Sequence, residues 1–322
     1  MRRADPSAPT PASIRRMSLR DRAVGSVLGL ALGDALGAPF ESLRSHQIPA
    51  PIPALELSGM DLPPGSTTEA TAMARNLVGS LILHERLAPE DVLRRHIEWS
   101  ATAPAVAGSF TRRVLARASS GEVDAARAVW EERGPEASAG NGSVMYCGPL
   151  GVGYASRPEE LHEAGPALSA LTHWDQRCGT SVTALTLAVA ALVRGEPVEA
   201  SIQGALIAVE DQPGGEELEF LVDAVGDSRA IDGPDRGFCL FSAGAALQAP
   251  LRHRTFEAGL FGVVALGGDT GSNAAAAGAL LGAIAGSSGL PGDWLGRLQH
   301  RSEIEAESEA LAVLAERESE PR

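Results

Sequence analysis

The sequence predicts an all-α protein, folded as a single compact domain of about a dozen helices. Apolar residues recur every three to four positions in twelve segments, whereas the alternation typical of strands is nearly absent. Gly and Ala are abundant, and aromatic residues make up only 4% of the chain. Because small residues let helices approach closely, this composition favours a tightly packed helical body.

The predicted helices lie between two tails of different composition. With 322 residues, 44% of them hydrophobic, the chain can bury a substantial core. No internal repeat appears, so we expect one domain over residues 19–300. The predicted helices cover 22–36, 71–87, 90–100, 109–118, 124–132, 143–155, 159–171, 179–194, 215–225, 238–249, 255–265 and 273–285.

Three segments depart from the helical pattern. Residues 1–18 are rich in Pro, Ser, Ala and Arg, which predicts a disordered tail. Residues 42–66 carry many Pro and Gly residues and predict a long loop, a feature that is often functional inside a compact domain. Residues 301–322 are charged and predict a C-terminal tail or a terminal helix that frays.

Charge and residue usage exclude several classes of function. A net charge of −14 argues against nucleic acid and membrane surfaces as partners, although one pocket can still hold a small anion. All 27 basic residues are Arg, which excludes Schiff-base and P-loop lysines. The apolar runs are short of a membrane span, apart from a borderline stretch near residue 280 that we interpret as a buried helix.

The three cysteines, Cys147, Cys178 and Cys239, match no zinc-binding spacing. An odd number of cysteines, without a recognisable signal peptide, predicts buried thiols in a reducing cytoplasm. The sequence does not indicate an oligomeric state.

Asp34 and Glu41 are the candidate catalytic residues. Asp34 lies in an otherwise apolar helical run, where a carboxylate needs hydrogen bonds or a charged partner. Gly37 and Pro39 then end the helix, and Glu41 opens the long loop, from which it can reach over a pocket. The alternative is that Asp34 caps another element and Glu41 is simply solvated.

Thr68 and Glu69 stand at a predicted helix start. A hydroxyl from Thr67 or Thr68 followed by an acid is typical of an N-terminal cap. The same oxygen atoms, clustered at a helix N-terminus, could instead hold a metal ion. The residues alone leave both interpretations open.

A Gly-Asn-Gly-Ser segment forms the third candidate, with Gly140, Asn141, Gly142 and Ser143 as ligand-binding residues. Glycines let a backbone approach a ligand closely, and a helix that follows offers free N–H groups to a phosphate. A simple turn followed by a helix cap is the alternative.

The fourth candidate is the segment with Gly268, Asp269, Thr270 and Ser272, which leads into an Ala-rich helix. Its polar groups could hold a cation or bind a ribose. A dinucleotide loop would need a preceding strand, and the sequence predicts none there. His173, between two predicted helices, could donate to a phosphate or a ribose hydroxyl, or be an interior histidine with satisfied hydrogen bonds.

The order and spacing of these segments resemble the ADP-ribosylglycohydrolase family over about residues 22–298. The matching features are Gly-Asp-Ala-Leu-Gly-x-Pro-x-Glu, Thr-Ala-Met, Gly-Asn-Gly, Thr-His and the late Gly-Gly-Asp-Thr. The resemblance implies an all-α fold that hydrolyses the bond between C1″ of ADP-ribose and an acceptor, in a cleft with two Mg²⁺ ions. Glu41 matches the Glu that covers the family's cleft and acts on water.

The metal motifs depart from the family's pattern. The family's Thr-Asp-Asp-Thr is here 68–71, Thr-Glu-Ala-Thr, and its Asp-Thr-Asp-Thr is here 269–272, Asp-Thr-Gly-Ser. Ala70 and Gly271 thus replace two carboxylates, one of them bridging, which normally offset the repulsion between two divalent ions. We therefore expect one weakly held Mg²⁺ ion or no metal at all. The possible ligands in matching positions are Thr68, Glu69, Asp269 and Ser272.

Two functions follow from the resemblance. One is a hydrolase acting on ADP-ribose or a related nucleotide-sugar bond, with Glu41 as base supported by Asp34, Glu69 and Asp269. The other is a catalytically inactive protein that binds ADP-ribose or a partner and serves a regulatory role. The sequence does not identify the acceptor.

Overall fold

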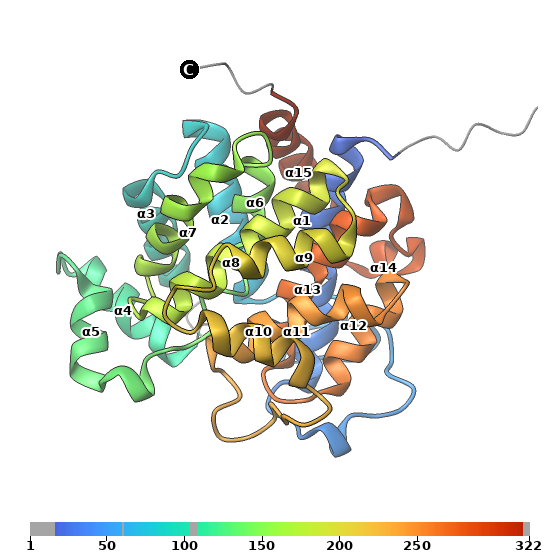
Figure 1. Ribbon diagram of the computed structural model, residues 1–322, viewed down its shortest axis with the longest axis horizontal. Coiled ribbons are helices and arrows are strands. Elements are labelled where there is room, and N and C mark those ends of the chain that lie inside the picture. The colour runs from blue at the N-terminus through green and yellow to red at the C-terminus, as the bar shows by residue number, and fades with distance from the viewer. Residues whose placement is uncertain (1–16, 60, 103–107, 318–322) are drawn as a thin grey trace, which may run out of the picture.

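The computed structural model describes residues 17–59, 61–102 and 108–317, which form fifteen α-helices (Figure 1). Within these ranges no strand forms, and backbone pairing outside the helices is limited to isolated bridges such as Gly140 with Phe238. The prediction of an all-α fold is confirmed.

Each of the twelve predicted helices corresponds to an observed one, although the segment at 143–155 forms a turn and only a six-residue helix. Two short helices, α9 and α14, were not predicted. The bounds are α1 Leu19–Gly37, α2 Glu69–His84, α3 Pro89–Thr102, α4 Ser109–Ser119, α5 Ala125–Arg133, α6 Gly148–Gly153, α7 Leu161–Ala170, α8 Gln176–Arg194, α9 Val198–Ile207, α10 Gly215–Ala224, α11 Cys239–Arg252, α12 Phe256–Ala265, α13 Thr270–Ala285, α14 Gly292–Arg297 and α15 Arg301–Glu316.

Helices α1 and α13 cross the centre of the molecule in direct backbone contact (Figure 1). A Cβ atom added at Gly29 would lie 2.2 Å from the carbonyl oxygen of Gly278, and one at Gly33 would lie 1.9 Å from that of Ala274. Glycines at four-residue spacing therefore let the two helices pack antiparallel without side chains between them. This packing places the end of α1 beside the start of α13, where two of the candidate segments lie.

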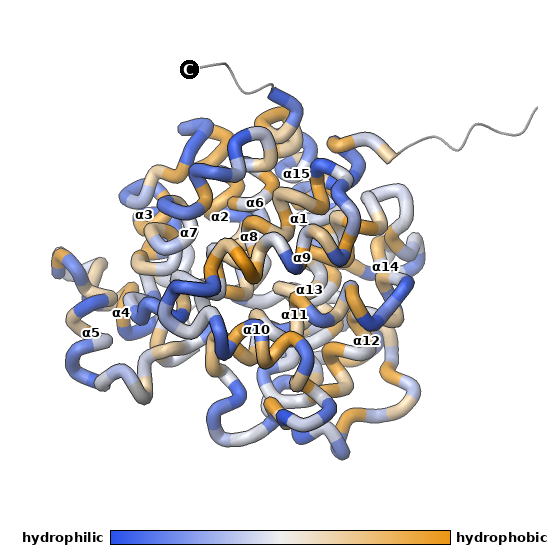
Figure 2. Tube along the Cα trace, viewed as in Figure 1, coloured by the Kyte–Doolittle hydropathy of each residue, from blue (hydrophilic) through white to orange (hydrophobic). Residues whose placement is uncertain are grey.

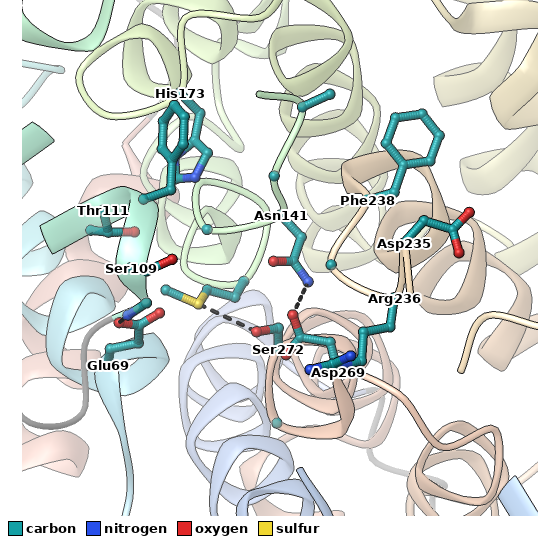
Figure 3. A pocket seen from close by; sticks show the side chains of 18 of the residues that line it. Glu69, Ser109, Thr111, Asn141, His173, Asp235, Arg236, Phe238, Asp269 and Ser272 are labelled. Carbon is teal, nitrogen blue, oxygen red and sulfur yellow. Dashed lines mark hydrogen bonds between the residues drawn. The ribbon is translucent and has the colours of Figure 1, made fainter. Parts of the chain in front are cut away.

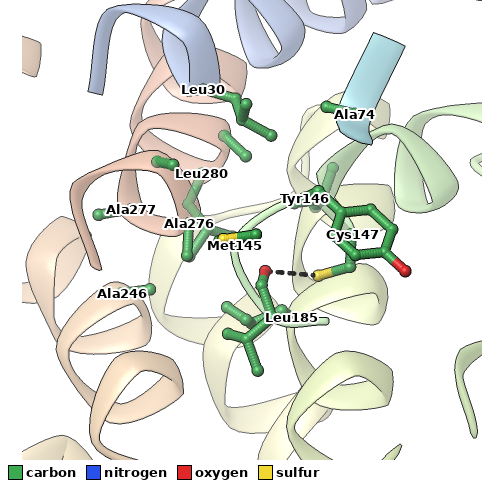
Figure 4. Close-up of a cluster of buried hydrophobic side chains, with 14 of the residues drawn as sticks. Leu30, Ala74, Met145, Tyr146, Cys147, Leu185, Ala246, Ala276, Ala277 and Leu280 are labelled. Atoms are coloured by element: carbon green, nitrogen blue, oxygen red, sulfur yellow. Dashed lines mark hydrogen bonds between the residues drawn. The ribbon is translucent and has the colours of Figure 1, made fainter. Parts of the chain in front are cut away.

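Every residue of α1 from Ala23 to Gly37 is buried, which makes it a core helix enclosed on all sides. The hydrophobic stretches converge on this centre, and hydrophilic residues line the outer turns (Figure 2). Met145, Tyr146 and Cys147 form a buried turn that packs among the helices carrying Leu30, Leu185 and Leu280 (Figure 4).

Two helices contradict the expectation that no apolar run except that near residue 280 approaches the length of a membrane span. Leu19–Phe40 and Gln176–Arg194 are long and apolar enough for that, and 94% and 83% of the apolar 18-residue window in each is buried within the protein. They serve here as core helices. The stretch near residue 280 belongs to α13 and is buried, as predicted.

The flanking segments differ in part from their predictions. At the C-terminal end, residues 301–316 form helix α15, whose Ile304, Leu311 and Leu314 are buried in the main core. The described residues between 42 and 66 form the expected long loop, which contains a 3₁₀ turn at Ser45–Gln47. Most of the predicted N-terminal tail lies outside the described residues, and Ser18 caps α1 by accepting a hydrogen bond from the Asp21 amide.

Candidate active site

A cavity of about 840 Å³ opens where the starts of α2, α4 and α13 meet the Gly-Asn-Gly turn and the 234–238 loop (Figure 3). Its size lies within the range of small-molecule sites. Nine of the thirteen predicted site residues line it: Glu41, Thr68, Glu69, Gly140, Asn141, Gly142, His173, Asp269 and Ser272. The other four, Asp34, Ser143, Gly268 and Thr270, do not.

Asp34 caps helix α2 from outside the cavity lining. Its fully buried carboxylate accepts hydrogen bonds from the amides of Thr68 and Thr71, at 2.8 and 3.0 Å, and from both hydroxyl groups, each at 2.6 Å. The hydroxyl cap predicted at the start of α2 is therefore wrong, because Thr68 makes no side-chain cap and Asp34 replaces it. Burial raises the pKa of Asp34, and the four hydrogen bonds act in the opposite direction. This placement favours the structural alternative for Asp34.

Glu41 lies against the first turn of α13. Its side chain accepts a hydrogen bond from the amide of Gly271 at 3.0 Å and shares another with Asp269. Burial, followed by the charge of Asp269, raises the pKa of Glu41 to about 10, while the Gly271 amide and Arg236 act in the opposite direction. Because two carboxyls in contact cannot both ionise easily, Glu41 keeps a proton at neutral pH that it can share with Asp269.

Glu69 begins α2 on the other side of the pocket floor, with Ser272 between it and Asp269 in the view of Figure 3. It accepts a hydrogen bond from the amide of Gly108, which precedes α4. Burial is the main cause that raises the pKa of Glu69 to about 8, and the charges of Asp269 and Asp34 add to it. Glu69 therefore joins α2 to the start of α4.

Asn141 connects the Gly-Asn-Gly turn to α13 through a chain of hydrogen bonds. Its amide nitrogen donates to Asp269 and to the hydroxyl of Ser242, each at 2.8 Å, and Ser242 donates to Asn273 at 2.6 Å. Figure 3 shows the first of these contacts across the cavity. The network therefore helps to fix the orientation of Asp269.

The two glycines of this turn make room for His173. A Cβ atom at Gly142 would lie 2.5 Å from the imidazole, and one at Gly140 would lie 3.3 Å from it. The His173 ring stacks on Phe110, with ring centroids 5.0 Å apart, and one ring nitrogen bonds the Thr172 hydroxyl at 2.9 Å. Burial lowers the pKa of His173 to about 4, so the ring is neutral at pH 7. His173 thus shapes the cavity wall as a neutral group.

Ser143, Gly268 and Thr270 have structural partners instead of facing the cavity. The Ser143 hydroxyl bonds that of Ser169 at 2.9 Å, and Thr270 donates to the carbonyl of Gly37 at 2.8 Å, which fastens α13 to α1. The backbone of Gly268 pairs with the loop at residues 42–43 and has a φ of +80°, which favours glycine.

The helix expected to follow Gly142, with free N–H groups for a phosphate, is absent. Residues 141–146 form turns, and α6 starts only at Gly148. The amides of Val144 and Met145 already donate to the carbonyl of Asn141. Phosphate binding at these two amides is therefore excluded.

Sequence reasoning missed the cationic and aromatic lining of the cavity. Arg236 and Phe238 come from the 234–238 loop, whereas Phe110 lies in the first turn of α4. The guanidinium of Arg133 lies 5.5 Å from the Phe110 ring, and that of Arg177 lies 5.4 Å from Phe238. A Gly-Pro-Asp-Arg-Gly run at 233–237 is the signal that could have marked this loop.

The oxygen atoms at the floor form a sparse set of possible metal ligands. Among the described residues, no three His, Cys, Asp or Glu side chains form a group that could hold a metal ion. Ala70 is buried and has no side-chain oxygen, and Gly271 presents an amide donor to Glu41. The Ser272 hydroxyl points to the sulfur of Met145 at 3.6 Å.

Comparison with known proteins identifies the family. A family model described as ADP-ribosylglycohydrolase matches residues 15–321. The chain is 27% identical over 303 residues to the ADP-ribosyl-[dinitrogen reductase] glycohydrolase of Rhodospirillum rubrum, covering 92% of this chain and 97% of that protein. It is 26% identical over 325 residues to the ADP-ribosylarginine hydrolase Tri1 of Serratia proteamaculans, covering 96% and 83%.

A solved structure agrees with this assignment. The chain superposes on an ADP-ribosylglycohydrolase-related protein complex with a TM-score of 0.74 and 32% identity, over 92% of this chain and 99% of that one. Both the sequence match and the shared helical fold extend over nearly the whole chain. The protein therefore belongs to the ADP-ribosylglycohydrolase family.

Proposed function

We propose that this chain hydrolyses the glycosidic bond between ADP-ribose and an acceptor on a modified protein, without a two-metal centre. The contact between Glu41 and Asp269 at the cavity floor carries this proposal. Hydrolysis of a glycosidic bond needs a group that takes a proton from water and a way to protonate the leaving group. A hydrogen-bonded pair of carboxyls that holds one proton has both capacities.

The lining of the cavity suits a nucleotide sugar. The faces of Phe110 and Phe238 are apolar surfaces against which a base can stack. Arg133 and Arg236 supply positive charge for a diphosphate inside a protein whose net charge is −14. A cavity of about 840 Å³ accommodates a ligand of this size.

The proposed reaction takes place at C1″ of the bound ADP-ribose. The bond from C1″ to the acceptor breaks, and a bond from C1″ to the oxygen of water forms. Glu41 and Asp269 take the proton from that water, and the proton they already share goes to the departing acceptor. The Gly271 amide holds the Glu41 carboxyl in place, and Asn141 holds that of Asp269.

The residues present do not fit the family's pair of Mg²⁺ ions. Magnesium requires octahedral oxygen coordination, and two adjacent ions need bridging carboxylates. Ala70 and Gly271 lack side-chain oxygens, and the Gly271 amide already binds Glu41. No step of the proposed reaction therefore passes through a metal ion.

Loss of those two oxygen-bearing side chains also favours a second candidate. A cavity that keeps its aromatic and cationic lining but lacks metal ligands can bind ADP-ribose without cleaving it. The chain would then act as a catalytically inactive binding or regulatory protein. The two candidates predict different results for Glu41→Gln. If the chain is a hydrolase, this change should slow the release of ADP-ribose, whereas an inactive binding protein releases none with or without it.

Release of ADP-ribose from an ADP-ribosylated peptide, measured with Mg²⁺ and with a chelator, tests the proposal. We expect release under both conditions, and loss of at least roughly a hundredfold in rate for Glu41→Gln. Glu56→Gln is the matched control, because Glu56 is exposed and pairs with Arg297 away from the cavity. Calorimetric binding of ADP-ribose with no release by the wild-type protein would support the inactive alternative. Release that the chelator abolishes would overturn the metal-independent mechanism.

A further inference from the structure

Two cysteines from distant parts of the chain meet directly behind the cavity wall. Cys178 lies in the first turn of α8, and Cys239 is the first residue of α11. Both side chains are fully buried, and the neighbouring Cys239 thiol, together with burial, raises the pKa of the Cys178 thiol well above its ordinary value. The Cys178 thiol also donates to the carbonyl oxygen of Gly140, a cavity-lining residue, at a sulfur-to-oxygen distance of 3.2 Å. The backbone at Gly140 therefore lies between this cysteine pair and the cavity.

Each cysteine adjoins a residue that lines the cavity. Arg177 precedes Cys178, Phe238 precedes Cys239, and the guanidinium of Arg177 lies 5.4 Å from the Phe238 ring. The amide of Cys239 donates to the carbonyl of Ala139, beside Gly140. A change in the distance between the two sulfurs should therefore move the cavity-lining residues Arg177 and Phe238, or the turn that contains Gly140.

From this geometry we infer that Cys178 and Cys239 form a reversible, redox-sensitive disulfide that alters ligand binding in the adjacent cavity. A disulfide joins α8 to α11 at their first turns. It also consumes the thiol hydrogen that Cys178 now donates to Gly140. Gly140 and Asn141 then lose one of the contacts that fix them, which weakens binding of an anionic nucleotide.

The chemistry requires a peroxide as oxidant. One cysteine sulfur attacks the O–O bond of hydrogen peroxide, which yields a sulfenic acid and one water molecule. The second sulfur attacks that sulfenic sulfur, forms the S–S bond and releases a second water. Two thiols are oxidised and one peroxide is reduced, and an external thiol such as glutathione reverses the reaction by exchange.

Cys147 is an internal comparison for this pair. It is as deeply buried as the other two, but its thiol donates to the carbonyl of Val144 at 3.2 Å, and among the described residues no second cysteine is paired with it. It cannot form an intramolecular disulfide without a neighbour. Burial therefore does not distinguish Cys147 from Cys178 and Cys239. The presence of a neighbouring cysteine does.

The test exposes the full-length protein to hydrogen peroxide and then labels the remaining thiols after unfolding. We expect an intact mass lower by two hydrogen atoms, one labelled thiol at Cys147, and a Cys178–Cys239 cross-linked peptide that disappears with a reductant. Cys178→Ser and Cys239→Ser should each block the cross-link, whereas Cys147→Ser should leave it intact. Labelling of all three thiols after treatment, or equal modification of Cys147, would overturn the disulfide.

The effect on the cavity has its own readouts. The oxidised protein should bind ADP-ribose roughly fivefold or more weakly than the reduced protein by calorimetry. The amides of residues 139–142 should exchange hydrogen faster after oxidation, and Cys178→Ser should show neither change. Unaltered exchange in the cross-linked protein would refute the coupling. Failure of the reduced protein to bind ADP-ribose counts against the proposed function only, because the mass and exchange measurements need no ligand.

Discussion

The side chain of Glu41 accepts a hydrogen bond from the backbone amide of Gly271 at 3.0 Å. A Cβ atom at position 271 would lie 3.3 Å from the same carboxyl oxygen. Glu41 therefore occupies the space that a carboxylate side chain at residue 271 would need. The lack of a side chain at residue 271 and the position of the proposed catalytic carboxyl are two aspects of one arrangement.

Gly271→Asp should displace Glu41 and slow the release of ADP-ribose by roughly tenfold or more, because the added carboxylate would crowd Glu41 and place a third acidic group beside the Glu41–Asp269 pair. Gly271→Ala should cost much less, since a methyl group at 3.3 Å requires a shift of only a few tenths of an ångström. Rates for both variants, measured with and without Mg²⁺, check this prediction. Equal rates for the two variants would contradict the position of the Glu41 carboxyl beside residue 271.

Asp34→Asn should destabilise the protein by about 1–3 kcal/mol, because the single acceptor oxygen of Asn would replace two carboxylate oxygens that now accept four hydrogen bonds from Thr68 and Thr71. The start of α2 carries Glu69, so the affinity for ADP-ribose should fall as well. Asp21→Asn is a matched control, since Asp21 accepts hydrogen bonds from Ser287 and Ser288 at the other end of α1.

Denaturant unfolding and calorimetry of both variants check this prediction. Both changes should lower the free energy of unfolding, but only Asp34→Asn should weaken ADP-ribose binding. A loss of affinity of the same size in Asp21→Asn would show that general destabilisation accounts for the effect, and not the position of α2.

The helices could be predicted because their signal is local. Helix α1 and helix α8 repeat apolar and small residues over their whole length, and their bounds differ from the prediction by a few residues only. Helix α9 was missed because it buries only Ser201, Ile202 and Ala205, so its apolar stripe is weak. Residues 301–322 were predicted only as a tail or a fraying helix. The apolar stripe of α15 can be recognised only once α1 and α2 pack against it.

The site was predictable to the extent that its residues stand at helix ends, as Glu41, Glu69 and Asp269 do. The direction of each side chain was not predictable, because the sequence does not show which neighbour each helix end meets. Thr270 thus turns to the carbonyl of Gly37, whereas Ser272 two residues later lines the cavity. Arg236 stands in an irregular loop that has no periodic pattern.

Arg236→Gln should weaken ADP-ribose binding by about tenfold, equivalent to about 1.4 kcal/mol. The guanidinium lines the cavity near Glu41 and supplies positive charge for the diphosphate. Arg252→Gln removes the same charge at the end of α11, where Arg252 pairs with Asp227 outside the cavity. Calorimetry at two salt concentrations checks this prediction. Equal losses for the two variants would mean that net charge, and not a local contact, sets the affinity.

Gly33→Ala should destabilise the protein by about 2 kcal/mol or more, because its methyl group would lie 1.9 Å from the Ala274 carbonyl and force α1 from α13. Gly204→Ala, in an exposed part of α9 with no atom within 4 Å of the added Cβ, should instead stabilise it by about 0.5–1 kcal/mol. Denaturant unfolding of the two variants checks the opposite signs. Two effects of the same sign would contradict the close packing of α1 on α13.

His96 should make the stability of the protein depend on pH below its ordinary pKa. The ring is fully buried, bonds Asn76 at 3.2 Å and packs edge-on against Tyr146. Burial lowers the pKa of His96 from 6.5 to about 3. Between these values the unfolded chain binds a proton that the folded chain does not, so its contribution is present above pH 6.5 and is lost as the pH falls.

At pH 5 the loss is about 2 kcal/mol relative to pH 7.5. Because the buried carboxyls titrate in the opposite sense, the measurement compares the wild-type protein with His96→Gln at each pH, so that all other groups cancel. The difference in free energy of unfolding between the two proteins should shrink by that amount from pH 7.5 to pH 5. A difference that stays constant would mean that His96 accepts a proton in the folded protein without cost, which its burial beside Tyr146 argues against.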